Sequence, residues 1–180
     1  MKSPSGNALL TRDEFREGTL LRDGHKCVIC GRGLSDGVKL DAHHIMERRL
    51  WRGENEFGGY FLDNGSTLCD TGYEKTNNGD WSCHLKAGMT LLAPDTIRKA
   101  CGIQKTLLPE HLYSDQIYTV WGDPVMGNGL RMRGELFNDE SVQFMLKLGN
   151  VLDQYVWHVR HPRTYHLPYS PIVTAVQHNA

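Results

Sequence analysis

The stretch Asp41-Ala42-His43-His44-Ile45 holds two adjacent histidines in a segment of strand-like length, residues 39–45, that ends on an apolar side chain. Neighbouring side chains of a β-strand point to opposite faces of the sheet. His43 and His44 are therefore expected to have different roles, one imidazole binding a metal ion and the other activating a water molecule. The alternative is that both histidines are structural. Asp41 either orients one of the histidines or is a solvated residue of the strand, and the sequence favours neither role.

Four of the five cysteines bracket this segment. Cys27 and Cys30 precede it, two residues apart on a glycine-rich turn, and Cys69 and Cys83 follow it. Thiolates at this spacing can both point at one ion, because the backbone folds around a roughly tetrahedral centre. The four cysteines are therefore predicted to bind a structural zinc ion (Zn²⁺), whose four thiolate ligands leave no open position for substrate or water. Such a staple would stabilise a domain with a small core.

Other roles for the cysteines remain open. Cys69 and Cys83 would alternatively be small buried apolar side chains. Cys27 and Cys30 have the spacing of a redox pair, although such a pair is expected at the start of a helix that follows a strand. Cys101 lies among apolar residues of a predicted helix and is expected to be a core thiol. The odd number of cysteines argues against a disulfide framework.

The composition limits the functions open to the chain. The 180 residues carry a formal net charge of −1, so there is no global attraction to nucleic acid or to a membrane surface. No apolar run reaches the length of about 18 residues that a membrane-spanning helix needs, and the first residues lack the apolar segment of a signal peptide. We therefore expect a cytoplasmic protein with reduced thiols, in a bacterial or phage-infected cell.

A nucleic-acid partner would need a local basic face. Arg48, Arg49 and Arg52 follow the histidines closely and are candidates to bind backbone phosphates. Trp51, which stands among them, is a candidate to stack on a base. The alternative is a solvated charged loop, because glutamates stand nearby. Residues 160–166 in the tail form a second candidate phosphate-binding strip.

The remaining patterns predict an α+β chain made of two parts. A capping box at Thr11–Glu14 opens a helix that ends near Gly24, and another helix begins near Cys83. Residues 46–60 are charged and rich in glycine, so a surface excursion is expected there. Residues 1–94 would form the metal-binding domain.

The second part, residues 95–180, is predicted to be a mainly helical extension packed on this domain. A short helix is expected over Asp95–Ala100. Asn138 would cap a longer helix, in which apolar residues fall at helical spacing as far as Val159. The tail after Pro162 is rich in proline and is expected to be extended.

Taken in order along the chain, these residues resemble the signature of HNH endonucleases that carry a zinc knuckle. The matching positions are Cys27, Cys30, Asp41-Ala42-His43-His44-Ile45, Asn64, Leu68-Cys69 and Cys83-His84. The resemblance covers roughly residues 20–90 and implies the ββα-metal (His-Me finger) fold. One departure is clear: the family usually has two residues between its last two cysteines, whereas thirteen separate Cys69 from Cys83 here.

The resemblance also implies a function, a metal-dependent endonuclease that hydrolyses phosphodiester bonds, with DNA favoured over RNA. His44 would be the general base, His43 and His84 would bind the catalytic metal ion, and Asn64 would orient His44 through hydrogen bonding. An imidazole with a pKa of about 6.5 suits a general base. Position 88, one turn after His84, is glycine, so a third histidine ligand is absent there. A site with so few protein ligands favours Mg²⁺ or Mn²⁺.

Other functions remain open. The chain would alternatively be a non-catalytic, zinc-stapled module that binds nucleic acid or protein, or a redox protein built on Cys27 and Cys30. Residues 161–170 resemble a stretch near the start of some RNA ligase domains. This second resemblance implies association with an RNA ligase, and a nuclease that acts in RNA processing or repair.

Overall fold

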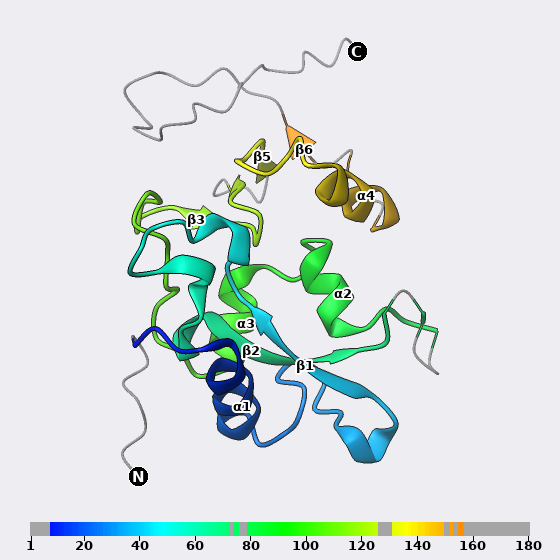
Figure 1. Cartoon of the computed structure of the whole chain (residues 1–180). Helices are drawn as coiled ribbons and strands as arrows, with labels where there is room; N and C mark the ends of the chain where they lie inside the picture. The colour runs from blue at the N-terminus through cyan, green and yellow to red at the C-terminus, as the bar shows by residue number, and fades with distance from the viewer. Residues whose placement is uncertain are drawn as a thin grey trace, which may run out of the picture.

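Two antiparallel strands at the centre of the molecule carry both adjacent histidines. The computed structural model describes residues 8–72, 74–75, 79–125, 131–149, 152 and the backbone of 155–156. Strand β1 (Lys39–His44) pairs with strand β2 (Gly65–Asp70). Helix α1 (Arg12–Arg22) packs against both strands, and helix α2 (Cys83–Gly88) packs against β2. The two helices lie on opposite sides of the strand pair (Figure 1), so the described fold is mixed α/β.

The register of the strand pair brings α1 close to the histidines. His44 lies opposite Gly65 at one end of the ladder. Gly65 permits the close approach of α1, because a Cβ atom there would lie 2.4 Å from Thr19 Oγ1 and 2.8 Å from Phe15 Cε2. The strand predicted over residues 39–45 is confirmed to within one residue.

Helix α1 forms where its capping box predicts it. The Thr11 hydroxyl accepts a hydrogen bond from the Glu14 backbone N–H at 3.3 Å, and the Glu14 carboxylate accepts one from the Thr11 backbone N–H at 2.9 Å. The helix ends at Arg22, and Gly24 then adopts a left-handed φ of 64°. Phe15 buries its ring on the face of α1 that meets the strands. The local sequence therefore determines both ends of this helix.

The prediction of a surface excursion over residues 46–60 is only partly confirmed, because Arg48, Arg52 and Glu54 are exposed while three apolar residues of the segment are buried. Met46, Leu50 and Trp51 are at most 2% exposed and belong to a hydrophobic cluster shared with the second half of the chain. The Trp51 indole N–H donates to the Met46 carbonyl at 3.3 Å. Because the segment alternates charged and apolar side chains without a regular period, its burial is not visible in the sequence. Its short 3₁₀ turns are Arg48–Leu50 and Phe57–Gly59, and a further one, Leu62–Asn64, precedes β2.

The described residues of the second half of the chain are not mainly helical, in contrast to the prediction for residues 95–180. They form two helices and a small sheet with the strand order β3-β4-β5-β6. The elements are α3 (Pro94–Ala100), β3 (Ile117–Tyr118), β4 (Pro124–Val125), β5 (Arg131–Met132), α4 (Glu140–Leu148) and β6 (Tyr155–Val156). The short helix predicted over Asp95–Ala100 is confirmed as α3.

Helix α4 is shorter than its apolar spacing predicts. Its N-cap is Asp139 rather than Asn138, because the Asp139 carboxylate accepts hydrogen bonds from the backbone N–H groups of Ser141 and Val142. The helix ends at Leu148, and its C-cap is Gly149, where an added Cβ would lie 2.9 Å from the side chain of Met89. Strand β6 then pairs in parallel with β5. Sheet pairing therefore replaces the expected helical continuation, while residues 157–180 lie outside the described part of the chain.

Two hydrophobic clusters form the core, and both contain residues from either side of position 94. One includes Trp51, Trp121 and Leu146, and the other includes Leu68 and Ile97.

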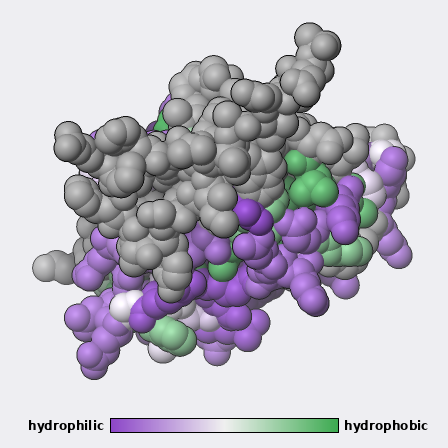
Figure 2. All heavy atoms as spheres, turned by 90° about the horizontal axis from the view of Figure 1, so that it is seen from above, coloured by the Kyte–Doolittle hydropathy of each residue, from purple (hydrophilic) through white to green (hydrophobic). Residues whose placement is uncertain are grey.

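Seen from above, the described surface is mostly hydrophilic, with apolar side chains in separate patches (Figure 2). Among the described residues, no helix has the length and apolar character needed to cross a membrane.

Candidate functional site

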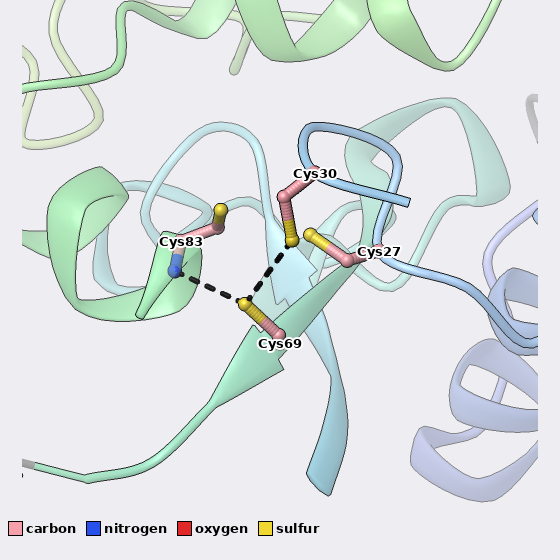
Figure 3. Close-up of side chains that lie close together, drawn as sticks. All are labelled: Cys27, Cys30, Cys69 and Cys83. Atoms are coloured by element: carbon pink, nitrogen blue, oxygen red, sulfur yellow. Dashed lines mark hydrogen bonds between the residues drawn. The ribbon is translucent and has the colours of Figure 1, made fainter. Parts of the chain in front are cut away.

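The four cysteines predicted to bind zinc come together in one cluster. Cys27 and Cys30 lie on the turn after α1, Cys69 lies in β2, and Cys83 is the first residue of α2 (Figure 3). Their sulfur atoms all lie within 4.8 Å of one another. The Sγ atoms of Cys30 and Cys69 are 3.7 Å apart. A tetrahedral site with Zn–S bonds of about 2.3 Å has S–S edges of about 3.8 Å, so the donor set fits a structural zinc ion.

Backbone hydrogen bonds shape the turn that presents the first two thiols. Gly31 has a φ of 74° and donates its N–H to the Cys27 carbonyl at 2.8 Å. The Cys27 N–H in turn donates to the Arg32 carbonyl at 2.8 Å. The Val28 N–H donates to the Thr67 carbonyl at 2.9 Å, which ties the turn to β2. A glycine is needed where the turn requires a left-handed backbone.

The electrostatics of the cluster also suit a cation. Hydrogen bonds from Cys69 and Cys83 lower the pKa of the Cys27 thiol, whereas the hydrogen bond to Cys27 raises that of Cys83. The contact with Cys27 also raises the pKa of Cys69, to about 11. One thiolate therefore opposes ionisation of its neighbours, and a divalent cation would allow all four to ionise.

Two N–H groups point at sulfur and support thiolate character. The Arg32 Nε–H donates to Cys30 Sγ at 3.3 Å, and the Cys83 backbone N–H donates to Cys69 Sγ at 3.3 Å. Cys101, in contrast, stands outside the cluster at the end of α3, where burial raises the pKa of its thiol to about 12. The prediction that Cys101 is separate from the metal cluster is confirmed, but its thiol is only partly buried and packs against the core rather than within it.

A cleft of about 300 Å³ lies beside the strand pair and collects the predicted catalytic histidines. It is lined by side chains of α1, β1, α2 and the segment that follows β1. The lining residues that carry charge or can titrate near neutral pH are His43, His44, His84, Asp41, Glu47, Arg12, Arg16 and Arg48. The structure therefore brings three of the four predicted catalytic residues to one cavity.

His44 is held on the side of β1 that faces α1. Its ring stacks on Phe15 with 4.5 Å between ring centroids and meets the Tyr60 ring edge-on at 5.2 Å. Burial and the charge of Arg48 lower the pKa of His44 to about 4, although a hydrogen bond to the Gly58 backbone acts in the opposite direction. Its Nε2 atom has no hydrogen-bond partner in the described chain. His44 is therefore a neutral imidazole with one nitrogen left to accept a proton.

Asn64 does not hydrogen-bond to His44, so the predicted contact is wrong. The Asn64 side chain is fully buried and accepts a hydrogen bond from the Met46 N–H at 2.9 Å. Its amide donates to the carbonyls of Met46 and Gly59 at 3.2 and 3.0 Å. Asn64 therefore holds the backbone just after His44 and just after Gly58. It positions the imidazole indirectly, through the segments on which His44 and its backbone partner lie.

His43 and His84 meet on the other side of β1. Their ring centroids lie 5.1 Å apart, edge to face. Burial lowers the pKa of His43 well below its usual range, and the nearby His84 adds to this effect. Burial is the largest single influence on the pKa of His84 and lowers it, but the contact with Asp70 and the charges of Asp41 and Glu47 together outweigh burial, so the pKa of His84 is raised overall. The two imidazoles differ in protonation behaviour because only His84 has a carboxylate partner.

The predicted arginines divide into two groups. Arg48 lines the cleft and donates to the Tyr60 hydroxyl at 3.3 Å. Arg49 instead forms an ion pair with Asp139 at 2.6 Å, and Arg52 one with Glu135 at 2.6 Å. These two arginines tie the segment after β1 to the second half of the chain, so of the three only Arg48 lies at the cleft.

Sequence reasoning missed several cleft residues. Arg12 and Arg16 stand four residues apart and therefore lie on one face of α1, and Tyr60 and Glu47 come from the segment after β1. Asp70, which lies beside His84 but does not line the cleft, was missed as well, although it directly follows Cys69 just as His84 directly follows Cys83. The position of Asp70 directly after a cysteine of the cluster is the sequence feature that could have identified it.

Comparisons with known proteins add no relative. No family model, no curated protein and no solved structure matches the chain.

Proposed function

We propose that this chain is a metal-dependent endonuclease of the HNH type, with β1, β2 and α2 as its ββα-metal core. The observation that carries the proposal is the cleft in which His43, His44 and His84 gather in different electrostatic environments. Phosphodiester hydrolysis needs both a base for the attacking water and a cation at the phosphate. The opposite faces of β1 support such a division between His44 and His43.

His44 is the proposed general base. It is neutral at physiological pH, and the Gly58 backbone engages one of its ring nitrogens while Nε2 has no partner among the described residues. A base must be unprotonated and must present a free lone pair, and both conditions are met. Phe15 and Tyr60 hold the ring in place, and Asn64 anchors the backbone around it.

His43 and His84 are the proposed ligands of the catalytic divalent ion, Mg²⁺ or Mn²⁺. When bound, that ion would offset negative charge on the phosphate and on the leaving oxygen. The cysteine cluster is a separate, structural zinc site, because its four thiolates leave no open coordination position.

The proposed substrate is nucleic acid, with DNA favoured. Arg12, Arg16 and Arg48 surround the three histidines, although the chain as a whole carries a net charge of −1. A local group of guanidinium ions can bind backbone phosphates without any global basic charge. A nuclease that acts on RNA in repair or ligation is the second possibility, prompted by residues 161–170, which lie outside the described residues.

A plasmid-nicking assay tests the proposal. The zinc-loaded protein is incubated with supercoiled DNA and Mg²⁺ or Mn²⁺, in parallel with single-stranded DNA and RNA. His44→Ala should lower the cleavage rate on the order of 10²–10⁴-fold. His25→Asn is the matched control, because His25 is an exposed histidine outside the cleft with a left-handed φ of 54° that asparagine tolerates. Unchanged cleavage by His44→Ala would refute the assigned base.

The same assay separates the nuclease from a zinc-stapled binding module. A binding module would retain nucleic acid on a gel but cleave none of the three substrates with either metal ion. That result would overturn the nuclease proposal and leave the binding function.

A further inference from the structure

Two carboxylates lie beside His84 in an arrangement that the nuclease motif does not account for. Ligand atoms of Asp41, Asp70 and His84 all lie within 4.8 Å of one another. Asp41 comes from β1, Asp70 is the last residue of β2, and His84 is in the first turn of α2. Three separate elements therefore contribute one potential metal ligand each to the same point.

Among the described residues, backbone N–H groups and the Arg16 guanidinium orient the two carboxylates through their Oδ1 atoms. Asp41 Oδ1 accepts from the Arg16 guanidinium and from the Ala42 N–H, the latter at 3.0 Å. Asp70 Oδ1 accepts from the Gly72 N–H at 2.8 Å. In each residue Oδ2 is left for another partner, and Asp70 Oδ2 lies 3.7 Å from His84 Nδ1. Metal-binding carboxylates are commonly held in this way by outer hydrogen bonds.

A second observation independently points to a ligand at this place. His43 Nε2 is shielded from solvent and has no hydrogen-bond partner in the described chain. Its ring packs edge to face with His84 in the same cleft, which Asp41 also lines. A buried polar nitrogen without a partner is costly, and a bound cation would satisfy it.

We propose that Asp41 and Asp70 are direct ligands of the divalent metal ion at His84, which makes the site rich in oxygen donors. The catalytic role of this ion rests on the proposed function, but its binding can be tested without any assay of nuclease activity. Two imidazoles by themselves suit Zn²⁺ or Ni²⁺, whereas carboxylates suit Mg²⁺ and Mn²⁺. The two aspartates therefore set the metal preference of the cleft.

The spacing of the group suits a six-coordinate ion. With metal–oxygen distances of about 2.1 Å, neighbouring octahedral ligands lie about 3 Å apart and opposite ones about 4.2 Å apart. The separations of up to 4.8 Å require only a small inward movement of the side chains. Asp41 and Asp70 are each partly exposed, with 41% and 31% of their side-chain surface accessible, so water can complete the coordination.

Binding of Mn²⁺ alone, followed by electron paramagnetic resonance on zinc-loaded protein, tests the assignment. Asp41→Asn and Asp70→Asn keep the side-chain shape and remove the charge. Each should weaken Mn²⁺ binding on the order of tenfold or more. Ni²⁺ binding should weaken less, because imidazoles retain it. Zinc content should stay unchanged in both variants.

Two control variants make the result specific. Asp80→Asn removes the same charge from an exposed aspartate that pairs with Lys86 and lies outside the group, so Mn²⁺ affinity should not change. Arg16→Gln removes the cation that orients Asp41 but leaves the carboxylate, so it should weaken Mn²⁺ binding less than Asp41→Asn does. A loss of Mn²⁺ affinity in Arg16→Gln as large as that in Asp41→Asn would show that Asp41 acts only through Arg16, and would overturn its role as a ligand.

The outcomes separate this inference from the proposed function. If Asp41→Asn and Asp70→Asn bind Mn²⁺ like the parent while His84→Ala does not, the carboxylate ligands are refuted and the nuclease proposal stands. An equal loss of Mn²⁺ and Ni²⁺ affinity would also refute them, because the aspartates would then only orient the histidines. If the variants lose Mn²⁺ selectively but the parent cleaves no nucleic acid, the metal site stands and the nuclease proposal fails.

Discussion

Asp70 Oδ2 lies 3.7 Å from His84 Nδ1, and each of these residues directly follows a cysteine of the thiol cluster. Cys69 and Cys83 share that cluster, and the Cys83 N–H also donates to Cys69 Sγ. A zinc ion held by the cysteines would therefore hold the aspartate and the histidine together as well. The cysteine cluster and the histidine cleft are therefore coupled, because the same two segments of chain contribute residues to both.

Loss of one thiol should release the zinc ion and destabilise the fold. Cys27→Ser is expected to lose zinc and to lower the free energy of unfolding by several kcal/mol, because binding of a structural zinc contributes directly to folding. Zinc content by mass spectrometry and chemical denaturation measure both effects. Cys101→Ser is the control, since Cys101 stands outside the cluster and should keep zinc. A Cys27→Ser protein that melts like the parent would exclude a structural zinc there.

The ionisation of His84 should depend on Asp70. In zinc-loaded protein without Mg²⁺, the titration of His84 followed by NMR should have its midpoint above 6.5, because the contact with Asp70 and the charges of Asp41 and Glu47 together outweigh burial. The contribution of this pair to stability is full at a pH below 6.5 and is lost as the pH rises through the raised pKa of His84. Asp70→Asn should lower the midpoint. A midpoint that Asp70→Asn leaves unchanged would contradict the pairing.

Removal of Asn64 should damage both stability and activity. Asn64→Ala deletes the hydrogen bonds to Met46 and Gly59 and leaves buried backbone groups without partners, at a cost of about 1–3 kcal/mol for each. Urea denaturation gives the stability, and the nicking assay gives the rate. Asn55→Ala, at an exposed asparagine, should change neither. Full activity in Asn64→Ala would show that the backbone around His44 needs no such anchor.

Arginines at the cleft and away from it should respond differently to salt. Arg48→Ala should weaken binding of a DNA duplex and reduce the salt dependence of binding by about one phosphate contact. Arg52→Ala should leave that salt dependence unchanged and lower stability instead, because Arg52 pairs with the nearly buried Glu135. Equal salt slopes for Arg48→Ala and the parent protein would remove Arg48 from the nucleic-acid surface.

Local patterns predict those parts of the structure that depend on neighbouring residues. The capping box at Thr11 defines the start of α1, and Gly31 permits the turn that presents Cys27 and Cys30. The strand predicted over residues 39–45 is recognisable from its length and from the apolar residue at its end. In each case hydrogen bonds or backbone sterics act within a few residues, so the pattern is readable along the chain.

Burial and pairing between distant segments are not readable in this way. The segment after β1 has no clear period, and its structure follows from packing of the two halves of the chain on each other. After α4 the helical spacing of apolar residues continues, but β6 pairs with the distant strand β5 instead. Arg49 and Arg52 look like phosphate ligands in the sequence, but acids some 80 to 90 residues away neutralise them. A charge in a sequence has no partner until the fold supplies one.

The sequence by itself determined which residues are the candidates for metal binding and for the proposed chemistry: the four cysteines of the cluster and the three histidines His43, His44 and His84. Only the tertiary structure decided how they combine, because distances between separate elements depend on packing rather than on spacing along the chain. The pairing of β1 with β2 and the packing of α2 on β2 bring Asp41 and Asp70 to His84. The same packing directs the Asn64 side chain to the backbone of Met46 and Gly59, and not to the His44 imidazole as predicted.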